Sequence, residues 1–358
     1  MLESVEDGET CPTLRARDED LIRTAYRLTR SISQRRPIIY WLDFLLAHCL
    51  GAVAFYWSAA ASGPPWPVRC ICFIGCGLLW YRSFAFIHEV VHFRAGEMRA
   101  FTTAWNLLAG IPFLCPSFMY SIHLEHHSRN VYGTGADGEY IPWGIKPPVS
   151  IALFPLVSLV APALALFRFV ILVPISWLSP GARAWLERRA SALVIRGSYR
   201  RPAPNKPELR IWRLQEPCAV LWAFLVVLGC LSGYFSWRWF LTGMAVMMTV
   251  SFVNSFRTML SHKFRNAGGT MTFLAQIEDS WNYPGGGLLT ELLCPVGLRF
   301  HALHHMLPHL PYHSLPDAHA MLMNMLPIDS AYRQTNSSSL WSAMRTLWVE
   351  AVSAPRES

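Results

Sequence analysis

Long hydrophobic runs separated by short polar segments dominate the chain. The first run covers about residues 38–61 and the second about residues 70–87, with a short connection at 63–68 between them. A longer apolar stretch at about 218–259 is interrupted near 233–238, which divides it into two runs of about twenty residues each. A helix of about twenty residues, rising about 1.5 Å per residue, crosses a hydrocarbon core of about 30 Å. The pattern therefore predicts four transmembrane helices in two hairpins.

Two other apolar stretches are harder to interpret as spans. The weaker one, at about 101–122, is broken by polar and proline positions and does not predict a clean span. The other covers about 149–178 and contains Pro155, Pro162 and Pro174. About thirty residues are too few for two full spans, and prolines suit bends. We expect a re-entrant or interfacial pair of helices here; the alternative is one true span, which would place the following segment on the opposite side.

The composition is that of a membrane protein. Hydrophobic residues make up 53% of the 358 residues and charged residues only 15%, whereas soluble domains carry about a quarter charged residues. The predicted fold is an all-α integral membrane protein with about four transmembrane helices, re-entrant or interfacial helices and a cytoplasmic helical cap. We expect a cytoplasmic N-terminal segment at 1–37, a single membrane domain at 38–350 and a frayed tail at 351–358.

Basic residues flank the apolar runs and predict the topology. The N-terminal segment is rich in arginine, and residues 179–215 contain nine lysines and arginines. Because loops rich in Lys and Arg stay in the cytoplasm, both segments are predicted to be cytoplasmic, in what we expect to be a bacterial inner membrane. This topology accounts for the net charge of +8, so nucleic-acid binding is not expected.

Three short histidine clusters provide the candidate chemistry. Eight of the thirteen histidines fall within the segments HEVVH, HLEHH and HALHH, and a further histidine closes the last apolar run. The nine are His88, His92, His123, His126, His127, His262, His301, His304 and His305. Neutral imidazole is a good ligand for iron, copper, nickel and zinc, and these imidazoles are too many for one ion. The clusters predict a site for two metals at the cytoplasmic ends of the apolar helices.

The spacing within the clusters suits metal binding by helices. His88 and His92 lie one helical turn apart and share a face. In each of the other clusters the first and last histidines share a face, and the middle one, His126 or His304, lies partly round the helix, where it can reach a second metal. HEVVH is also the HExxH zinc-hydrolase pattern with Glu89 as general base. An intramembrane zinc protease is a more distant alternative, which leaves the other two clusters unexplained.

With these boxes between paired apolar hairpins, the chain resembles the membrane fatty-acid desaturase and hydroxylase superfamily from about residue 38 to about residue 330. The stretch PVGLRFHALHHMLPHLPYHSLPDAH at 295–319 is similar to the C-terminal box of bacterial fatty-acid desaturase homologues. The resemblance implies two non-haem irons with O2 as co-substrate, the eight box histidines as ligands, and His262 as the family's extra histidine. Animal acyl-CoA desaturases carry an asparagine where this chain has Thr258, which favours the bacterial all-histidine branch.

The resemblance also implies the reaction, which is O2-dependent oxidation of an unactivated C–H bond in a lipid or fatty acyl chain. The C-terminal box favours desaturation; hydroxylation or monooxygenation of a lipid or alkyl substrate by the same site is the alternative. Members of the superfamily take electrons from a ferredoxin, a rubredoxin or a cytochrome b5 and its reductase. No donor domain is recognisable in the sequence, so a separate donor is expected to dock at the cytoplasmic face, where the basic segment 179–215 could attract an acidic ferredoxin.

Other polar residues are given supporting roles. Metal-bound imidazoles usually donate their second N–H to a carboxylate or carbonyl. Asp279 and Glu125 are the candidates for this role. Asp137 and Glu139 could serve likewise, but we expect them to lie in a solvated loop. The remaining histidines are expected to be structural or on the surface. They are His309, His313 and His319 after the third box, and His48, which is expected to hydrogen-bond to a neighbouring helix.

Overall fold

The structure, a computed structural model, describes residues 12–60 and 62–355. Over these residues the secondary structure is helical, with three isolated β-bridges and no β-strand. Within the described residues, five helices are long and apolar enough to cross a membrane: Pro37–Ala59, Trp66–Val91, Ala161–Leu178, Lys206–Leu231 and Trp237–Met259. The all-helical architecture confirms the predicted fold class, and the chain is an integral membrane protein.

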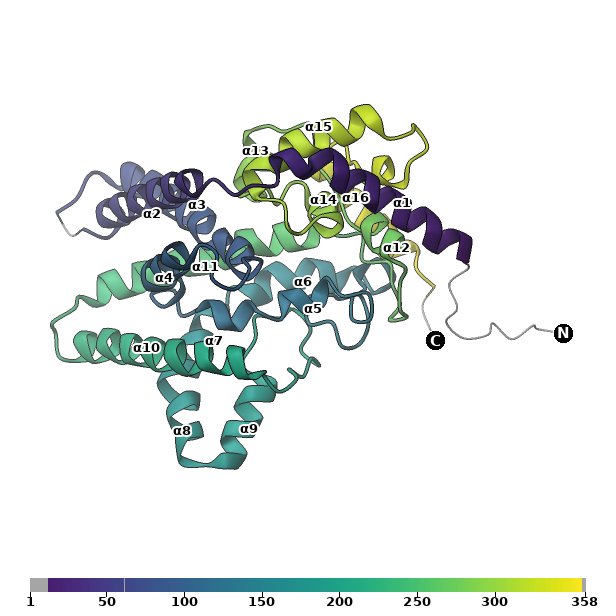
Figure 1. The fold of residues 1–358 in the computed structure, drawn as a ribbon. Coiled ribbons are helices and arrows are strands. Elements are labelled where there is room, and N and C mark those ends of the chain that lie inside the picture. The colour runs from purple at the N-terminus through teal and green to yellow at the C-terminus, as the bar shows by residue number, and fades with distance from the viewer. Residues whose placement is uncertain (1–11, 61, 356–358) are drawn as a thin grey trace.

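The two predicted hairpins form the part of the bundle that extends away from the chain termini in Figure 1. α2 (Pro37–Ala59) and α3 (Trp66–Val91) make the first hairpin, and α10 (Lys206–Leu231) and α11 (Trp237–Met259) make the second. A capping box begins α10. The Asn205 side chain accepts from the Glu208 N–H, and the Asn205 backbone N–H donates to the Glu208 carboxylate. Both hairpins occupy the apolar runs that predicted them.

Residues 149–178 form a pair of helical segments, as the sequence predicted. The first is α6 (Val149–Ser158). The second, Ala161–Leu178, comprises α7 (Ala161–Phe167), a π-helical stretch (Arg168–Leu172) and α8 (Val173–Leu178). This second segment is itself long enough to cross a membrane, which gives five candidate spans where the sequence predicted about four.

The flanks of this helical pair return to the same end of the molecule. Before the pair, the Gly144 N–H donates to the Phe264 carbonyl at 3.0 Å, two residues beyond His262. After it, the Leu193 N–H donates to the Met119 carbonyl at 2.8 Å, just before the second histidine box. The residues on either side of the whole stretch from α6 to α9 (Pro180–Arg189) therefore contact the histidine-bearing part of the chain.

α11 lies at the centre of the bundle and contacts α2, α3, α6 and α7. α3 approaches it closely at Gly77, where a Cβ atom would lie 3.1 Å from the Thr249 Cγ2. The outer faces of the hairpins carry exposed aliphatic side chains, among them Leu42, Ile71 and Leu221. Such surfaces suit a hydrocarbon environment, so the polar residues of the inner faces are the ones to examine for chemistry.

The helices after α11 gather with α1 at the other end of the bundle (Figure 1). They are α1 (Pro12–Thr29), α12 (Phe273–Glu278), α13 (Leu288–Leu293), α14 (His301–Met306), α15 (Leu315–Met325) and α16 (Leu340–Ser353). Shorter helices in the connections are α4 (Arg99–Trp105), α5 (His123–His126) and α9 (Pro180–Arg189). Further 3-10 or π segments lie at Arg30–Ile32, Asn106–Gly110, Ser117–Tyr120, Trp143–Ile145, Tyr312–Ser314 and Ala331–Thr335.

The C-terminal boundary differs from the predicted one. α16 continues to Ser353, whereas the sequence predicted a frayed tail from residue 351. The reason is burial, because Ala351 packs in a cluster with Trp143 and Leu347. Residues 356–358 of the predicted tail, and residues 1–11 of the predicted N-terminal segment, lie outside the described residues.

Candidate metal centre

His88 and His92 lie at the C-terminal end of α3, where the apolar helix meets the cap. His92 is the C-cap residue, so the two imidazoles are one turn apart on the same helical face. His88 is 4% exposed, and neither of its ring nitrogens has a hydrogen-bond partner in the protein. Leaving a buried polar nitrogen unpaired costs about 1–3 kcal/mol. An unpaired imidazole in this position therefore points to a bound ligand.

The nine histidines predicted as ligands come together in two groups. His88, His92, His123, His127 and His304 form the first, and His126, His262, His301 and His305 form the second. Within each group the candidate ligand atoms lie within 4.8 Å of one another. The two HxxHH boxes divide between the groups: the middle histidine of each box, His126 or His304, joins the group opposite to its neighbours. This division follows from helical geometry, because the middle residue faces away from the other two.

The nitrogen spacing within the groups fits metal binding. In the first group the His304 Nε2 lies 3.1 Å from the His92 Nε2 and 3.2 Å from the His127 Nε2. In the second group the His262 Nε2 lies 3.0 Å from the His301 Nε2 and 3.2 Å from the His126 Nε2. Nitrogens that bind one ion at about 2.1 Å and at right angles lie roughly 3 Å apart. Both groups therefore have the donor type and spacing that a metal ion needs.

Two buried carboxylates orient the second box. The His126 Nδ1–H donates to the Asp137 Oδ2 at 2.8 Å, and the His123 Nδ1–H donates to the Glu139 Oε1 at 3.0 Å. Because a carboxylate only accepts, the hydrogen must be on Nδ1, which leaves the Nε2 lone pair facing the metal group. Asp137 is 1% exposed and is itself held by the N–H groups of Gly133 and Glu139, each at 2.8 Å.

The expectation that Asp137 and Glu139 lie in a solvated loop is therefore wrong. The connection after the second box folds back over the histidines, so that both acids contact rings 11 and 16 residues before them. Glu125, predicted for this role, instead accepts from the Tyr199 hydroxyl at 3.3 Å. The available signal was the pair of acids in GADGEY so soon after a box, since a metal-bound imidazole needs an acceptor.

Asp279 was predicted to accept from a metal-bound imidazole, but in the structure it accepts from tyrosine hydroxyls. It accepts from the Tyr132 hydroxyl at 2.9 Å and the Tyr140 hydroxyl at 2.8 Å. The His262 Nδ1 lies 2.9 Å from the Tyr132 oxygen and 3.0 Å from the Ser280 oxygen. Asp279 thus orients the tyrosine that the His262 ring contacts.

Burial keeps most of these rings in the metal-binding form. It lowers the pKa of His127, His304 and His305 well below the usual range, and the neighbouring imidazoles lower each further. For His126, burial lowers the pKa but the Asp137 carboxylate raises it, and the net direction is upward. Only an imidazole with a free lone pair binds a metal, so the dry surroundings favour ligation.

The other histidines lie outside both groups. His48 contacts the Ser83 hydroxyl of α3 at 3.1 Å, which confirms the expected hydrogen bond between neighbouring helices. The His313 Nε2 accepts from the Arg36 N–H at 3.2 Å. His319 contacts the Tyr332 hydroxyl at 2.7 Å.

Comparison with known proteins places this site in a family. A model of the fatty acid desaturase family matches residues 64–336. The chain belongs to the fatty acid desaturase family. It is also 36% identical over 340 residues to a ceramide hydroxylase of Caulobacter vibrioides (strain NA1000 / CB15N), covering 93% of this chain and 94% of that protein. The chain is therefore a membrane oxidoreductase that oxidises C–H bonds of lipids.

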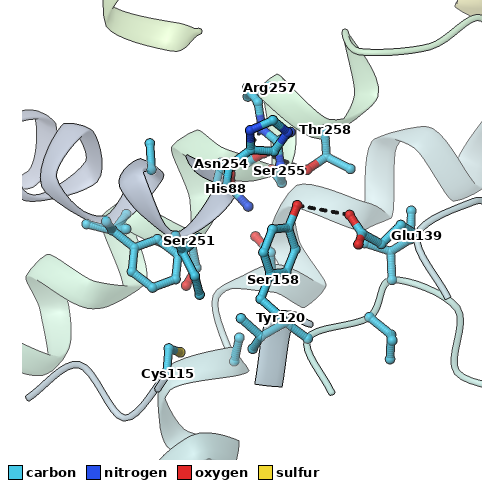
Figure 2. A pocket seen from close by; sticks show the side chains of 18 of the residues that line it. His88, Cys115, Tyr120, Glu139, Ser158, Ser251, Asn254, Ser255, Arg257 and Thr258 are labelled. Carbon is cyan, nitrogen blue, oxygen red and sulfur yellow. Dashed lines mark hydrogen bonds between the residues drawn. The ribbon is translucent and has the colours of Figure 1, made fainter. Parts of the chain in front are cut away.

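A cavity of about 400 Å³ adjoins the two histidine groups of this family member. His88 and His123 of the first group and His126, His262 and His301 of the second contribute to its wall. Most of the remaining wall is apolar and comes from α3, α6, α7 and α11. Figure 2 shows the His88 ring on this wall, with Tyr120 and Glu139 joined by a hydrogen bond. The cavity gives a hydrocarbon chain a place beside the candidate metal centre.

Proposed function

We propose that this chain is a di-iron oxygenase that hydroxylates an unactivated C–H bond of a ceramide-type lipid. The observation that carries the proposal is the position of both histidine groups on the wall of an apolar cavity. The similarity, over 93% of the chain, to a protein named as a ceramide hydroxylase supports hydroxylation and this substrate class. The nine histidines would hold two non-haem irons, with O2 as co-substrate.

The roles of the protein groups follow from their contacts. Two bound irons would supply activation of O2 for attack on a C–H bond that no side chain could oxidise. Asp137 and Glu139 hold the His126 and His123 rings by their Nδ1–H groups, so that the Nε2 atoms face inward. The apolar wall excludes water and restricts which carbon of the substrate approaches the histidine groups.

Hydroxylation and desaturation differ in where the oxygen goes. In hydroxylation one oxygen atom enters the C–H bond and the other leaves as water, with two electrons and two protons consumed. Desaturation is the second candidate, because the family takes its name from it and the same histidines would serve. It removes hydrogens from two adjacent carbons and reduces both oxygen atoms to water, so none enters the lipid.

We expect cells that express the wild-type chain under 18O2 to accumulate ceramides carrying one labelled hydroxyl group, read by mass spectrometry. The purified protein should hold about two irons per chain, one for each histidine group. Unlabelled ceramides with a new double bond would favour desaturation instead. Unchanged lipids in cells that contain the iron-loaded protein would contradict the proposal.

The zinc protease alternative is weakened by the position of Glu89. Its carboxylate accepts from the Tyr40 hydroxyl and, at 3.4 Å, from the Tyr312 N–H. A general base that acts on metal-bound water must face the metal, whereas these contacts tie Glu89 to α2 and to the segment after the third box. A content of about one zinc per chain, the amount such a site requires, would revive this alternative.

We place the centre on the cytoplasmic side of a bacterial inner membrane. The basic segment 179–215 packs against the histidine-bearing end of the molecule, since the Arg201 guanidinium donates to the Phe118 carbonyl at 3.1 Å. Because basic segments stay in the cytoplasm, this contact supports a cytoplasmic position for the histidine groups. The electrons would come from a separate ferredoxin, rubredoxin or cytochrome b5 type donor with its reductase.

Removing exposed charges from this segment should slow electron delivery. Arg188 and Arg189 are exposed, whereas the Arg183 guanidinium pairs with Glu216. Changing both exposed arginines to glutamine is expected to lower donor-dependent turnover several-fold at low salt and little at high salt, because salt screens exposed charges. The measurement is turnover against donor concentration at two ionic strengths, with Arg238→Gln in the first turn of α11 as control. Equal rates for wild type and double variant would contradict docking here.

A further inference from the structure

One face of α11 carries polar residues that face the cavity. Ser251, Asn254, Ser255, Arg257, Thr258 and Ser261 line it. The pairs 251/254, 251/255, 254/257 and 254/258 are three or four residues apart, so these five residues share one side of α11, and Ser261 follows just beyond its end. Figure 2 shows Asn254, Ser255, Arg257 and Thr258 gathered on one part of the cavity wall. Polar and ionisable side chains in a membrane-spanning helix are costly, and by default they mark a substrate or ion site.

Arg257 is the distinctive member of this stripe. Its Nε donates to the Asn254 Oδ1 at 3.2 Å and its Nη2 to the Thr258 Oγ1 at 3.2 Å. The Tyr81 and Tyr120 hydroxyls also lie within hydrogen-bonding reach of the guanidinium. All four acceptors are uncharged, and a guanidinium has five N–H donors. Arginines near helix ends often extend to the membrane surface, but Arg257 lines the internal cavity instead. One N–H donor is thus left for a molecule inside the cavity.

The position of Arg257 relates it to the histidine groups. It lies two residues before the end of α11 and five before His262, and both residues line the same cavity. A polar group bound at Arg257 would therefore lie close to the candidate metal centre. The carbons next to that polar group, rather than those in the middle of a long chain, would then be the ones beside the histidines.

The charges of the cavity favour an uncharged polar group. Glu139 lines the same cavity and accepts from the Tyr120 hydroxyl at 3.0 Å. Glu139 also interacts electrostatically with the Arg257 guanidinium. A ligand carboxylate would place a second negative charge beside the same cation, which is unfavourable in a site with little water. An amide carbonyl or hydroxyl oxygen can accept from Arg257 without that repulsion.

We propose that Arg257, positioned by Asn254 and Thr258, binds the uncharged polar head of the lipid substrate and determines which lipids the cavity accepts. The head would be an amide with neighbouring hydroxyl groups, as in a long-chain N-acyl lipid. This substrate class rests on the proposed function, but binding at Arg257 can be measured without any turnover.

The test compares binding of radiolabelled ceramide, free fatty acid and n-alkane of matched chain length to the purified, iron-loaded protein in detergent. We expect the wild type to bind ceramide most tightly. Arg257→Gln should weaken ceramide binding about tenfold, the value of one charge-assisted hydrogen bond, and leave alkane binding unchanged. Arg238→Gln, an exposed charge on the same helix, should bind all three lipids as the wild type does.

Several results would overturn the proposal. They are unchanged ceramide affinity in Arg257→Gln, an equal loss for the alkane, or tighter wild-type binding of the fatty acid than of ceramide. If Arg257→Gln does not retain iron, Asn254→Ala and Thr258→Val provide the comparison, because each removes one of the contacts that position the guanidinium. Wild-type protein that binds ceramide through Arg257 but incorporates no 18O would contradict the proposed function and leave this subsite standing.

Discussion

Replacing His304 with alanine is expected to abolish lipid oxidation. The His304 Nε2 is close to the Nε2 atoms of both His92 and His127, so its loss opens the first histidine group at its centre. Iron content should fall from about two to about one per chain, because the second group keeps all of its members. Turnover should fall by at least roughly three orders of magnitude, since no side chain replaces the redox chemistry of a metal. Lipid mass spectrometry and metal analysis of the purified variant measure both effects.

The matched control for this experiment is His309→Ala. His309 is five residues further along, lies outside both groups, and its ring contacts Tyr26 instead. It should retain both irons and the wild-type product level. A His304→Ala protein that retains its iron and makes the wild-type amount of product would show that the first group is not the metal site.

Periodicity and spacing were sufficient to predict much of this molecule. Runs of about twenty apolar residues have one stable conformation in a membrane, because a helix satisfies its own backbone hydrogen bonds. The spacing of His88 and His92, and of the HxxHH boxes, fixes which imidazoles share a face. The middle histidines were predicted to reach a second metal, and in the structure His126 and His304 each join the group opposite to their neighbours.

Contacts made by irregular connections could not be predicted in the same way. Asp137 and Glu139 lie beyond the second box in a segment without helical periodicity, so nothing in the local sequence specifies that it folds back over His126 and His123. Glu125 lies inside the box, yet its side chain faces Tyr199. Neighbouring positions on a helix point in different directions, so closeness in sequence was a poor guide to contact.

Burial of polar residues in the cavity was also invisible to the pattern. Arg257 precedes the end of an apolar run, where an arginine is normally attributed to the membrane surface. Only the packing of α6 and α7 against α11 places its stripe of polar residues on a cavity wall.

The second large effect is expected from Asp137, which the sequence placed in solvent. Asp137→Ala removes the acceptor for the His126 Nδ1–H, so the ring loses its fixed orientation and some basicity. Loss of such a partner typically weakens metal binding or activity about ten- to a hundred-fold. The iron retained during titration with a chelator measures this weakening. The loss should be confined to one of the two irons, because the first group keeps Glu139 on His123.

Glu125→Gln is the matched control. The Glu125 carboxylate lies in the same box but contacts Tyr199, so this variant should hold both irons with wild-type affinity. If Asp137→Ala also holds both irons that tightly, the carboxylate does not support the metal centre, and its burial has another cause.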